Sequence, residues 1–228
     1  MVTAAVAIAV AKAATLGCVI ALINQTVEIV THVPPDAILA HIERCARICY
    51  QSDTGNAEKL VRRLIRDGHE STIEHISITA IIVTDRGVTH ELVRHRLASY
   101  SQESTRYCNY SKGKFGGEIS VICPPGLDEP DAYAVWDDAM RYAEAAYMRL
   151  LRDGVSPEIA RSVLPTALKT QIAMTCNLRE WRHFIKLRAL GHHGKPHPRI
   201  KEIALMILEQ LHEAVPVVFD DLWEEAQR

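Results

Sequence analysis

The chain has 228 residues, of which 48% are hydrophobic and 24% are charged. This composition can supply one substantial hydrophobic core and differs from that of a disordered segment. The formal net charge of −2 argues against a protein that binds nucleic acid through bulk electrostatics, although a local arginine cluster can still hold a phosphate. We therefore expect one folded domain in which the placement of the arginines matters more than their number.

The first residues form an apolar segment that superficially resembles a membrane or signal segment, because residues 2–22 are rich in alanine, valine and isoleucine. Lys12 lies in its middle, where a basic residue costs roughly 2.5–3.5 kcal/mol in a spanning helix, and no positive cluster precedes the apolar run. We predict a helical or disordered N-terminal extension over residues 1–26 and a folded domain over residues 27–228.

Local patterns predict the first elements of that domain. Residues 27–33 are rich in β-branched side chains and stop at a Pro-Pro pair, which is typical of a strand followed by a turn. Asp36 is expected to cap a helix that runs to about Tyr50, and a second helix starts at Asn56 and ends at Gly68. A polar loop then leads into a strand over residues 76–84.

Six cysteines are present, with no Cys-x-x-Cys pair among them: Cys18, Cys45, Cys49, Cys108, Cys123 and Cys176. They lie mostly inside apolar or helical patterns, so we expect reduced, largely buried thiols in a cytoplasmic protein. Cys45 and Cys49 could be metal ligands on one helix face, but no second ligand pair has suitable spacing.

The most informative stretch is residues 89–110. Val88, Leu92 and Val93 lie at helical spacing, so the first part is predicted to be a helix, whereas the second part is a hydroxyl-rich loop without an apolar period. The helix would deliver the three basic residues at 94–96, Arg-His-Arg, into a polar loop.

Arg94 and Arg96 are two positions apart, so on a continuing helix they would contact different groups. Closely spaced donors follow them: Ser99, Ser101, Gln102, Ser104, Thr105 and Arg106. Such a series suits an anion or a nucleotide that needs many directed hydrogen bonds. The alternative is a solvated basic helix end and a polar loop, which is the commoner explanation of an isolated Arg-His-Arg.

Two histidine-bearing segments raise the question of a metal ion. Residues 68–75 include His69, His75 and two carboxylates, and residues 191–198 contain three histidines. Neither segment has a further ligand at suitable spacing. We therefore predict no metal site.

The rest of the chain reads as further helices and two strands, the first of which is predicted over residues 118–123 and ends at a Pro-Pro pair. A long amphipathic helix is expected over residues 131–153, with an apolar face that includes Val135, Ala139, Tyr142, Ala146 and Leu150. Ser156-Pro157 has the pattern of a helix start, leading to Arg161 amid apolar neighbours. Residues 168–176 predict a strand, and residues 200–215 and 217–223 predict packing helices.

Asn177 is expected to cap the helix that ends at Arg188. Positions 179 and 183 share a face of this helix, so Arg179 and His183 could address one ligand together. Arg188 emerges one turn beyond Phe184.

The pattern Arg94-His95-Arg96-x-x-Ser99-x-x-x-x-Ser104-x-Arg106-Tyr107 resembles the signature of the flavin-dependent (alternative) thymidylate synthases. Three remote segments also resemble motifs of that family: His-Glu-Ser-x-x-Glu-His at 69–75, Ala-Arg-x-x-Leu-Pro at 160–165, and Asn-x-Arg followed by Leu-Arg within 177–188. The resemblance covers most of the chain from Val27 onward. It departs at Ser101 and Gln102, where the family often has Asn and an acidic residue, and in the 191–198 loop, which is longer than usual.

This resemblance implies an α+β fold, a twisted mainly antiparallel sheet flanked by helices, in a single domain that assembles as a homotetramer with sites at subunit interfaces. No Gly-rich phosphate loop is present, so a Rossmann fold is not expected. The implied activity is reductive methylation of dUMP to dTMP, with 5,10-methylenetetrahydrofolate as carbon donor and FAD, reduced by NADPH, as hydride carrier. No covalent enzyme nucleophile is implied, so Ser104 would bind and not attack.

The resemblance also assigns roles to residues. It makes Arg188 the catalytic residue, because a permanently charged guanidinium can stabilise a negative uracil ring edge. It places the flavin against His69, Ser71, Arg94, His95, Arg96, Gln102, Asn177, Leu178, Arg179 and His183. It places dUMP against Glu91, Leu92, Val93, Arg94, Gln102, Glu103, Ser104, Thr105, Arg106, Arg161 and Arg188.

Two other classes of function remain as alternatives. One is a module that binds RNA or single-stranded DNA through the interleaved basic and aromatic residues Arg94, Arg96, Tyr100, Arg106, Tyr107 and Tyr110. The near-neutral charge and the remote matching segments weigh against it. The other is a metal-dependent hydrolase built from the histidine-rich segments. We expect neither nucleic acid nor membrane as a partner.

Overall fold

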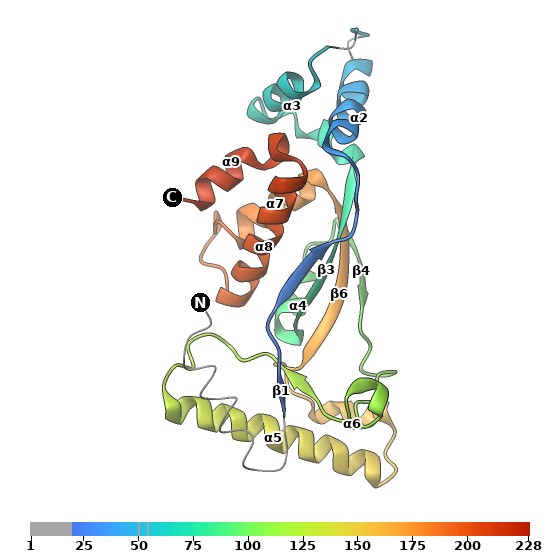
Figure 1. Ribbon diagram of the computed structural model, residues 1–228, viewed down its shortest axis with the longest axis vertical. Coiled ribbons are helices and arrows are strands. Elements are labelled where there is room, and N and C mark those ends of the chain that lie inside the picture. The colour runs from blue at the N-terminus through green and yellow to red at the C-terminus, as the bar shows by residue number, and fades with distance from the viewer. Residues whose placement is uncertain (1–19, 50, 54) are drawn as a thin grey trace. The chain divides into compact units, whose positions relative to one another are not determined.

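The computed structural model describes residues 20–49, 51–53 and 55–228 (Figure 1). Most of the expected N-terminal extension, up to residue 19, lies outside the described residues. Across the described ranges, no helix is long and apolar enough to cross a membrane. The chain divides into two compact units, which are described separately: the first comprises residues 1–25, 83–90 and 102–171, and the second comprises residues 26–82, 91–101 and 172–228.

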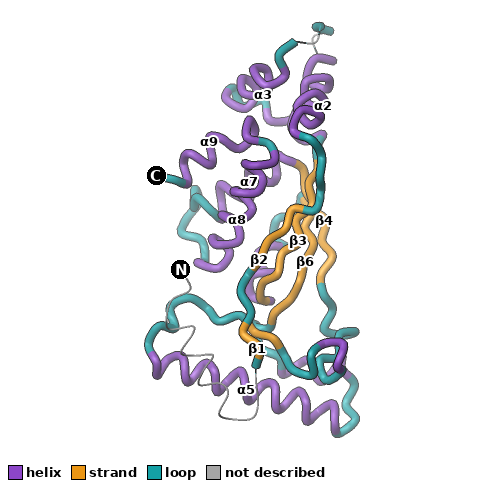
Figure 2. The backbone as a smooth tube through the Cα atoms, in the orientation of Figure 1, coloured by secondary structure: helices purple, strands orange, loops and turns teal. Residues whose placement is uncertain are grey.

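A four-stranded, mainly antiparallel sheet has the strand order β2-β3-β6-β4 (Figure 2). Its strands are β2 (Thr26–Ile29), β3 (Ser77–Asp85), β4 (Ala98–Gln102) and β6 (Lys169–Asn177). Buried and more exposed residues alternate along β3 and β6, as expected for strands with one face on the core. The predicted α+β class is confirmed, and the strands predicted at 76–84 and 168–176 are offset by one residue.

The expectation of an irregular hydroxyl-rich loop after Arg96 is wrong for residues 98–102, which form β4. Ser99 and Ser101 lie on the exposed face of this strand, while Ala98, Tyr100 and Gln102 are partly buried. Ala98 and Tyr100 do alternate with the two serines, as in a half-buried strand, but the run is only five residues long and ends in a glutamine, so the pattern is weak.

The helices of the second unit are α2 (Pro35–Ile48), α3 (Ala57–Arg66), the 3₁₀ helix η1 (Glu70–His75), α7 (Leu178–Arg188), α8 (Pro198–Ala214) and α9 (Pro216–Ala226). Helix α8 packs against β2, α7 and α9 (Figure 1). Ile200, Ile207 and Leu211 of α8 and Trp181 and Phe184 of α7 are fully buried. This apolar contact fixes α7, the helix that carries most of the expected cofactor residues.

Helix ends follow local sequence signals with one exception. Asn56 caps α3 by accepting a hydrogen bond from the Lys59 N–H (2.8 Å), and Gly68 adopts φ 78° after it, as predicted. Asp36 is not the cap of α2, because Pro34 precedes the helix and Asp36 lies within its first turn. Pro35 takes the first helical position, where its missing N–H costs nothing.

The first unit contains β1 (Ala21–Leu22), α4 (Arg86–Leu92, whose last two residues belong to the second unit), the 3₁₀ helices η2 (Gly113–Phe115) and η3 (Arg161–Val163), β5 (Ser120–Val121), α5 (Pro130–Arg152) and α6 (Pro157–Ala160). Strand β1 pairs in parallel with β5. The expectation of a helical or disordered segment is therefore wrong for residues 21 and 22. Strand β5 is also shorter than the predicted 118–123.

Helix α5 has the predicted length but buries a different face. Val135 and Tyr142 are 72% and 79% exposed, whereas Met140, Glu144 and Tyr147 are buried. The Glu144 carboxylate accepts a hydrogen bond from the Ile119 N–H (2.9 Å), which allows a charged residue to lie in the core. A face chosen by hydrophobicity alone therefore points away from the core of this unit.

The five described cysteines are in no disulfide, and Cys18 lies outside the described residues. Cys176 is buried, and this burial raises the pKa of its thiol. Cys49 is exposed and the other three are partly buried, so the expectation that the thiols are largely buried holds only for Cys176.

Candidate functional site

In the second unit, the turn after α4 buries the middle residue of the Arg-His-Arg sequence and exposes the two arginines. The N–H groups of Arg94 and His95 donate to the Glu91 and Leu92 carbonyls, at 3.3 and 3.0 Å. The Tyr100 hydroxyl lies within 2.8 Å of the Leu92 and His95 carbonyl oxygens and closes the turn. His95 is consequently buried, at 6% exposure, while the Arg94 and Arg96 side chains are exposed.

The His95 ring is held by a polar contact at each nitrogen. Its Nδ1 lies 3.2 Å from Glu180 Oε1, and its Nε2 accepts a hydrogen bond from Arg188 Nε at 3.2 Å. The Phe184 ring packs edge-on against it, with 5.0 Å between centroids. Burial first, and then electrostatic interactions with Arg188, His183 and Arg94, lower the pKa of His95 to about 4, so the ring is neutral at physiological pH.

Arg188, the expected catalytic residue, is fixed from both sides. Besides the bond to His95, its Nη1 donates to Glu91 Oε2 at 2.8 Å. Glu91 comes from α4 and Arg188 from the last turn of α7. The structure therefore brings together three residues that the sequence resemblance had assigned to two different ligands.

His95, Glu180 and His183 place three possible metal-ligand atoms within 4.8 Å of one another. This group differs from the two histidine-rich segments that the sequence suggested. The guanidinium charges of Arg188 and Arg94 act on His95 and oppose a cation here, and both ring nitrogens of His95 already have hydrogen-bond partners. We assign no metal to this group.

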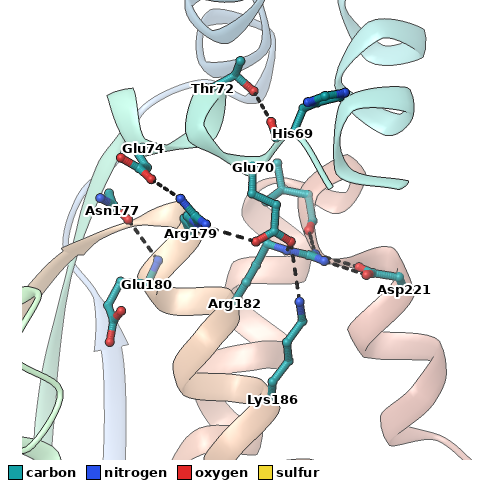
Figure 3. Close-up of polar contacts among 11 residues, drawn as sticks. His69, Glu70, Thr72, Glu74, Asn177, Arg179, Glu180, Arg182, Lys186 and Asp221 are labelled. Atoms are coloured by element: carbon teal, nitrogen blue, oxygen red, sulfur yellow. Dashed lines mark hydrogen bonds and ion pairs between the residues drawn. The ribbon is translucent and has the colours of Figure 1, made fainter. Parts of the chain in front are cut away.

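Of the flavin-side residues, His69 directly precedes η1, and Asn177 and Arg179 lie at the start of α7 (Figure 3). His69 and Ser71 are exposed, and Arg179 Nη1 pairs with Glu74 Oε1 at 2.6 Å. Asn177 caps α7 by accepting from the Glu180 N–H at 2.9 Å, as predicted. Leu178 is fully buried and its N–H donates to the Ile76 carbonyl, so this residue anchors the start of the helix.

Glu70, which lies 3.8 Å from Arg179, belongs to an ion-pair network that the sequence did not reveal. Arg182 is only 2% exposed, and its Nε donates to Glu70 Oε1 at 3.2 Å (Figure 3). Its two terminal nitrogens donate to the two Asp221 oxygens at 2.7 and 2.6 Å, and Nη1 also contacts the Val218 carbonyl. Lys186 Nζ is 3.5 Å from Glu70. The network ties η1 to α7 and α9.

In the first unit, two residues that were expected to bind a ligand form hydrogen bonds with other side chains of the protein. Gln102 Nε2 donates to the Thr89 and Thr170 hydroxyls, at 3.0 and 3.3 Å. Glu103 accepts from Lys169 Nζ and from the Tyr110 hydroxyl, both at 2.9 Å. Their roles toward a ligand remain predictions, and their visible role is to stiffen the loop that follows β4.

The next residues of that loop form a small cationic set. Arg161 Nη1 donates to Thr105 Oγ1 at 3.2 Å, which links η3 to the loop. Arg106 is exposed, pairs with Glu158 at 3.0 Å, and lies over the Tyr107 ring at 5.5 Å. Ser104 Oγ accepts from the Arg106 N–H at 3.3 Å. Two guanidinium groups and two hydroxyls are thus gathered within one short loop and η3.

The aromatic residues of the nucleic-acid alternative are mostly unavailable for stacking. Tyr110 is buried and donates to Glu103, and the Tyr100 hydroxyl is held by two backbone carbonyls. Tyr107 alone of the three is widely exposed, at 76%. A stacking platform would need several accessible rings.

An α+β chain that carries exposed arginines, a fixed Arg-His-Glu group and a loop with two further arginines and two hydroxyls has groups that suit anionic nucleotides and cofactors. Comparisons with known proteins identify the family. Residues 28–217 match the family described as thymidylate synthase complementing protein. The flavin-dependent thymidylate synthase of Mycolicibacterium vanbaalenii is 36% identical over 209 residues, which cover 82% of this chain and 80% of that protein.

The flavin-dependent thymidylate synthase of Mycobacterium tuberculosis (strain H37Ra) is also 36% identical, over 205 residues that cover 80% of this chain and 78% of that protein. Among solved structures, the UMP/dUMP methylase PolB from Streptomyces cacaoi bound with 5-Br dUMP has a TM-score of 0.74 at 26% identity, covering 88% of this chain and 96% of that one. The chain belongs to the flavin-dependent thymidylate synthase family, and it is an enzyme of that methyltransferase class.

Proposed function

We propose that this protein methylates dUMP to dTMP, taking the carbon from 5,10-methylenetetrahydrofolate and using FAD that NADPH reduces. The observation that carries the proposal is Arg188, held between Glu91 and His95 in a chain of this family. A structural relative that is a UMP/dUMP methylase bound with 5-Br dUMP supports dUMP as the substrate.

The second unit offers suitable groups for a flavin dinucleotide. Arg94 and Arg96 project from one turn as exposed guanidinium groups, and neither makes an ion pair with any residue that the structure describes. Uncommitted arginines suit the pyrophosphate of FAD, because charge-assisted bonds to phosphate are strong and directional. His69, Ser71, Arg179 and His183 are exposed or partly exposed and would hold the rest of the cofactor. When bound, the flavin supplies the hydride.

The first unit offers suitable groups for the phosphate of dUMP. Arg161, Arg106 and Ser104 offer two positive charges and a hydroxyl, and the buried hydroxyl of Thr105 accepts from Arg161 and holds it in place. Each charge-assisted hydrogen bond is worth about 1.5–3 kcal/mol. Arg106 would exchange its exposed partner Glu158 for the phosphate, which costs little because exposed ion pairs contribute about 0–1 kcal/mol.

Within this proposal Arg188 acts by charge. A guanidinium does not deprotonate at working pH, so it can stabilise negative charge on the uracil ring edge and make the ring carbon more electron-rich. Ser104 is a hydrogen-bond partner of its own loop, and nothing in the reaction requires it as a nucleophile. The carbon–carbon bond then forms without a covalent enzyme adduct.

The proposal is tested by the visible absorption spectrum of the purified protein, before and after NADPH and dUMP are added anaerobically. We expect flavin bands that bleach, followed by dTMP formation when methylenetetrahydrofolate is supplied. A colourless protein that also fails to take up added FAD would contradict the proposal and favour the nucleic-acid module.

The variant Arg188→Ala tests whether this arginine acts in catalysis. We expect turnover to fall far more than FAD content, since the residue is proposed to act on the substrate ring. Equal loss of turnover and bound FAD would mean that Arg188 only supports the structure.

A further inference from the structure

Four side chains of the second unit form one continuous series of hydrogen bonds around the proposed catalytic arginine. Glu180 Oε1 lies 3.2 Å from His95 Nδ1, His95 Nε2 lies 3.2 Å from Arg188 Nε, and Arg188 Nη1 lies 2.8 Å from Glu91 Oε2. Glu180 and His95 are both buried. The proposed function uses Arg188, Glu91 and His95 but gives Glu180 no role.

Chemistry fixes the direction of every bond in the series. A guanidinium has only N–H donors, so His95 Nε2 must accept from Arg188. A neutral imidazole has one proton, which must therefore be on Nδ1, where it is donated to the Glu180 carboxylate. The low pKa of His95, about 4, keeps the ring neutral and so keeps Nε2 able to accept.

The backbone holds Glu180 where this bond can form. Asn177 caps α7 by accepting from the Glu180 N–H, so Glu180 lies at the third position of the helix. One turn later, Phe184 packs against the His95 ring. Glu180 thus contacts one edge of the ring from the same helix that supplies both Phe184 and Arg188.

We propose that Glu180 is a positioning residue: by accepting the Nδ1 proton of His95, it selects the tautomer whose Nε2 holds Arg188 Nε in place. Its effect on the reaction passes entirely through His95. The inference rests on the proposed function only where turnover is measured.

Without an acceptor at position 180, the proton of His95 is free to move to Nε2. The Nε2–H would then point at the Nε–H of Arg188, and two donors cannot share a hydrogen bond. Arg188 would retain Glu91 but lose its second fixed point. A glutamine at this position would still offer an oxygen to Nδ1–H, so it preserves the tautomer while removing the charge.

The test compares Glu180→Ala with Glu180→Gln in the flavin-loaded protein. Carboxylates behind metal-bound histidines change activity by roughly 10–100-fold when they are removed, and we expect a loss of kcat in that range for Glu180→Ala. FAD content should be unchanged, and Glu180→Gln should keep most of the activity. Glu209→Ala, at an exposed glutamate of α8, controls for the loss of any helical carboxylate.

A second measurement identifies the tautomer of His95 directly and does not depend on enzyme activity. In protein labelled with ¹⁵N-histidine, with the His95 signals assigned by loss in His95→Gln, we expect a protonated Nδ1 in the wild type and in Glu180→Gln. Glu180→Ala should show a shift of the proton toward Nε2. An unchanged His95 tautomer in Glu180→Ala, or equal loss of kcat in the alanine and glutamine variants, would overturn the inference.

The experiments distinguish failure of the proposed function from failure of the proposed role of Glu180. If the proposed function is wrong, the wild type makes no dTMP, while the nitrogen spectra still decide whether Glu180 sets the tautomer. If the inference is wrong, the wild type turns over and the spectra of the wild type and Glu180→Ala agree.

Discussion

At the scale of single residues, His95 illustrates how burial gives an ionisable group a fixed chemical form. The groups that act on it are Glu180, which lies at hydrogen-bond distance from Nδ1, and Arg188, His183 and Arg94, whose electrostatic interactions lower its pKa. Burial has the largest effect on its pKa, and these electrostatic interactions add to it. The ring is therefore a neutral hydrogen-bond relay and is unsuited to acid catalysis near pH 7.

This lowered pKa predicts a pH dependence of stability. The pKa of His95 is about 4 in the folded chain and about 6.5 when unfolded, so the unfolded state takes up the proton first as pH falls. The free energy of unfolding should fall from about pH 7 toward pH 4, by at most roughly 3 kcal/mol from this residue. Urea unfolding at several pH values should show the slope in the wild type and a smaller one in His95→Gln. Parallel curves for the two proteins would show that His95 does not titrate this way.

At the scale of elements, α7 is where the sequence signals and the structure agree best. The Asn177 cap, the buried Trp181 and Phe184, and the terminal Arg188 follow from helical spacing and capping rules, which are local. Arg182 is the exception, because it lies on the buried side of the same helix. Burial alone would lower the pKa of Arg182, but the hydrogen bonds and charges of Asp221 and Glu70 raise it.

The network around Arg182 predicts a cost for removing its partner on α9. Asp221→Ala should destabilise the fold by about 2 kcal/mol, because a buried guanidinium loses a two-point charged partner. Arg182→Met with Asp221→Ala should cost less than the sum of the single changes, since the pair is removed together. Thermal and denaturant unfolding of the three variants measures the coupling. Additive effects would mean that the pair contributes no interaction energy.

Features of the fold and the site could be predicted from the sequence where they depend on residues close together in the chain, and not where they depend on distant ones. The extents of β3, β6 and α5 and the caps at Asn56 and Asn177 depend on neighbours within a few residues. The contact of Glu180 with His95 joins positions 85 apart, and no local pattern marks it. The buried face of α5 was misassigned because Glu144 is satisfied by the distant Ile119 N–H. The resemblance named many of the site residues but could not show their partners.

At the scale of the whole molecule, the misassigned face of α5 bears on assembly. Val135 and Tyr142 are seven positions apart, so they share a side of the helix, and both are widely exposed. Exposed apolar patches commonly mark interfaces between proteins. We propose that this face contributes to the homotetramer expected for the family.

The double variant Val135→Glu/Tyr142→Glu should lower the oligomeric state, because the new charges would have to be buried at the interface. Light scattering after size-exclusion chromatography measures the mass, and circular dichroism should remain unchanged. Ala134→Glu, at an exposed position that lies about 100° around the helix from Val135, is the control. An unaltered mass for the double variant would remove α5 from the interface.

Arg94 and Arg96 leave two uncompensated positive charges on one turn, and this affects how the protein behaves in any buffer. Inorganic phosphate and sulfate are small anions that guanidinium groups bind, so such buffers would compete with the cofactor phosphates that we propose to bind there. Screening also weakens long-range attraction beyond a Debye length of about 10 Å at 0.1 M salt. Cofactor affinities measured for this protein are therefore comparable only when the buffer anion and the ionic strength are held constant.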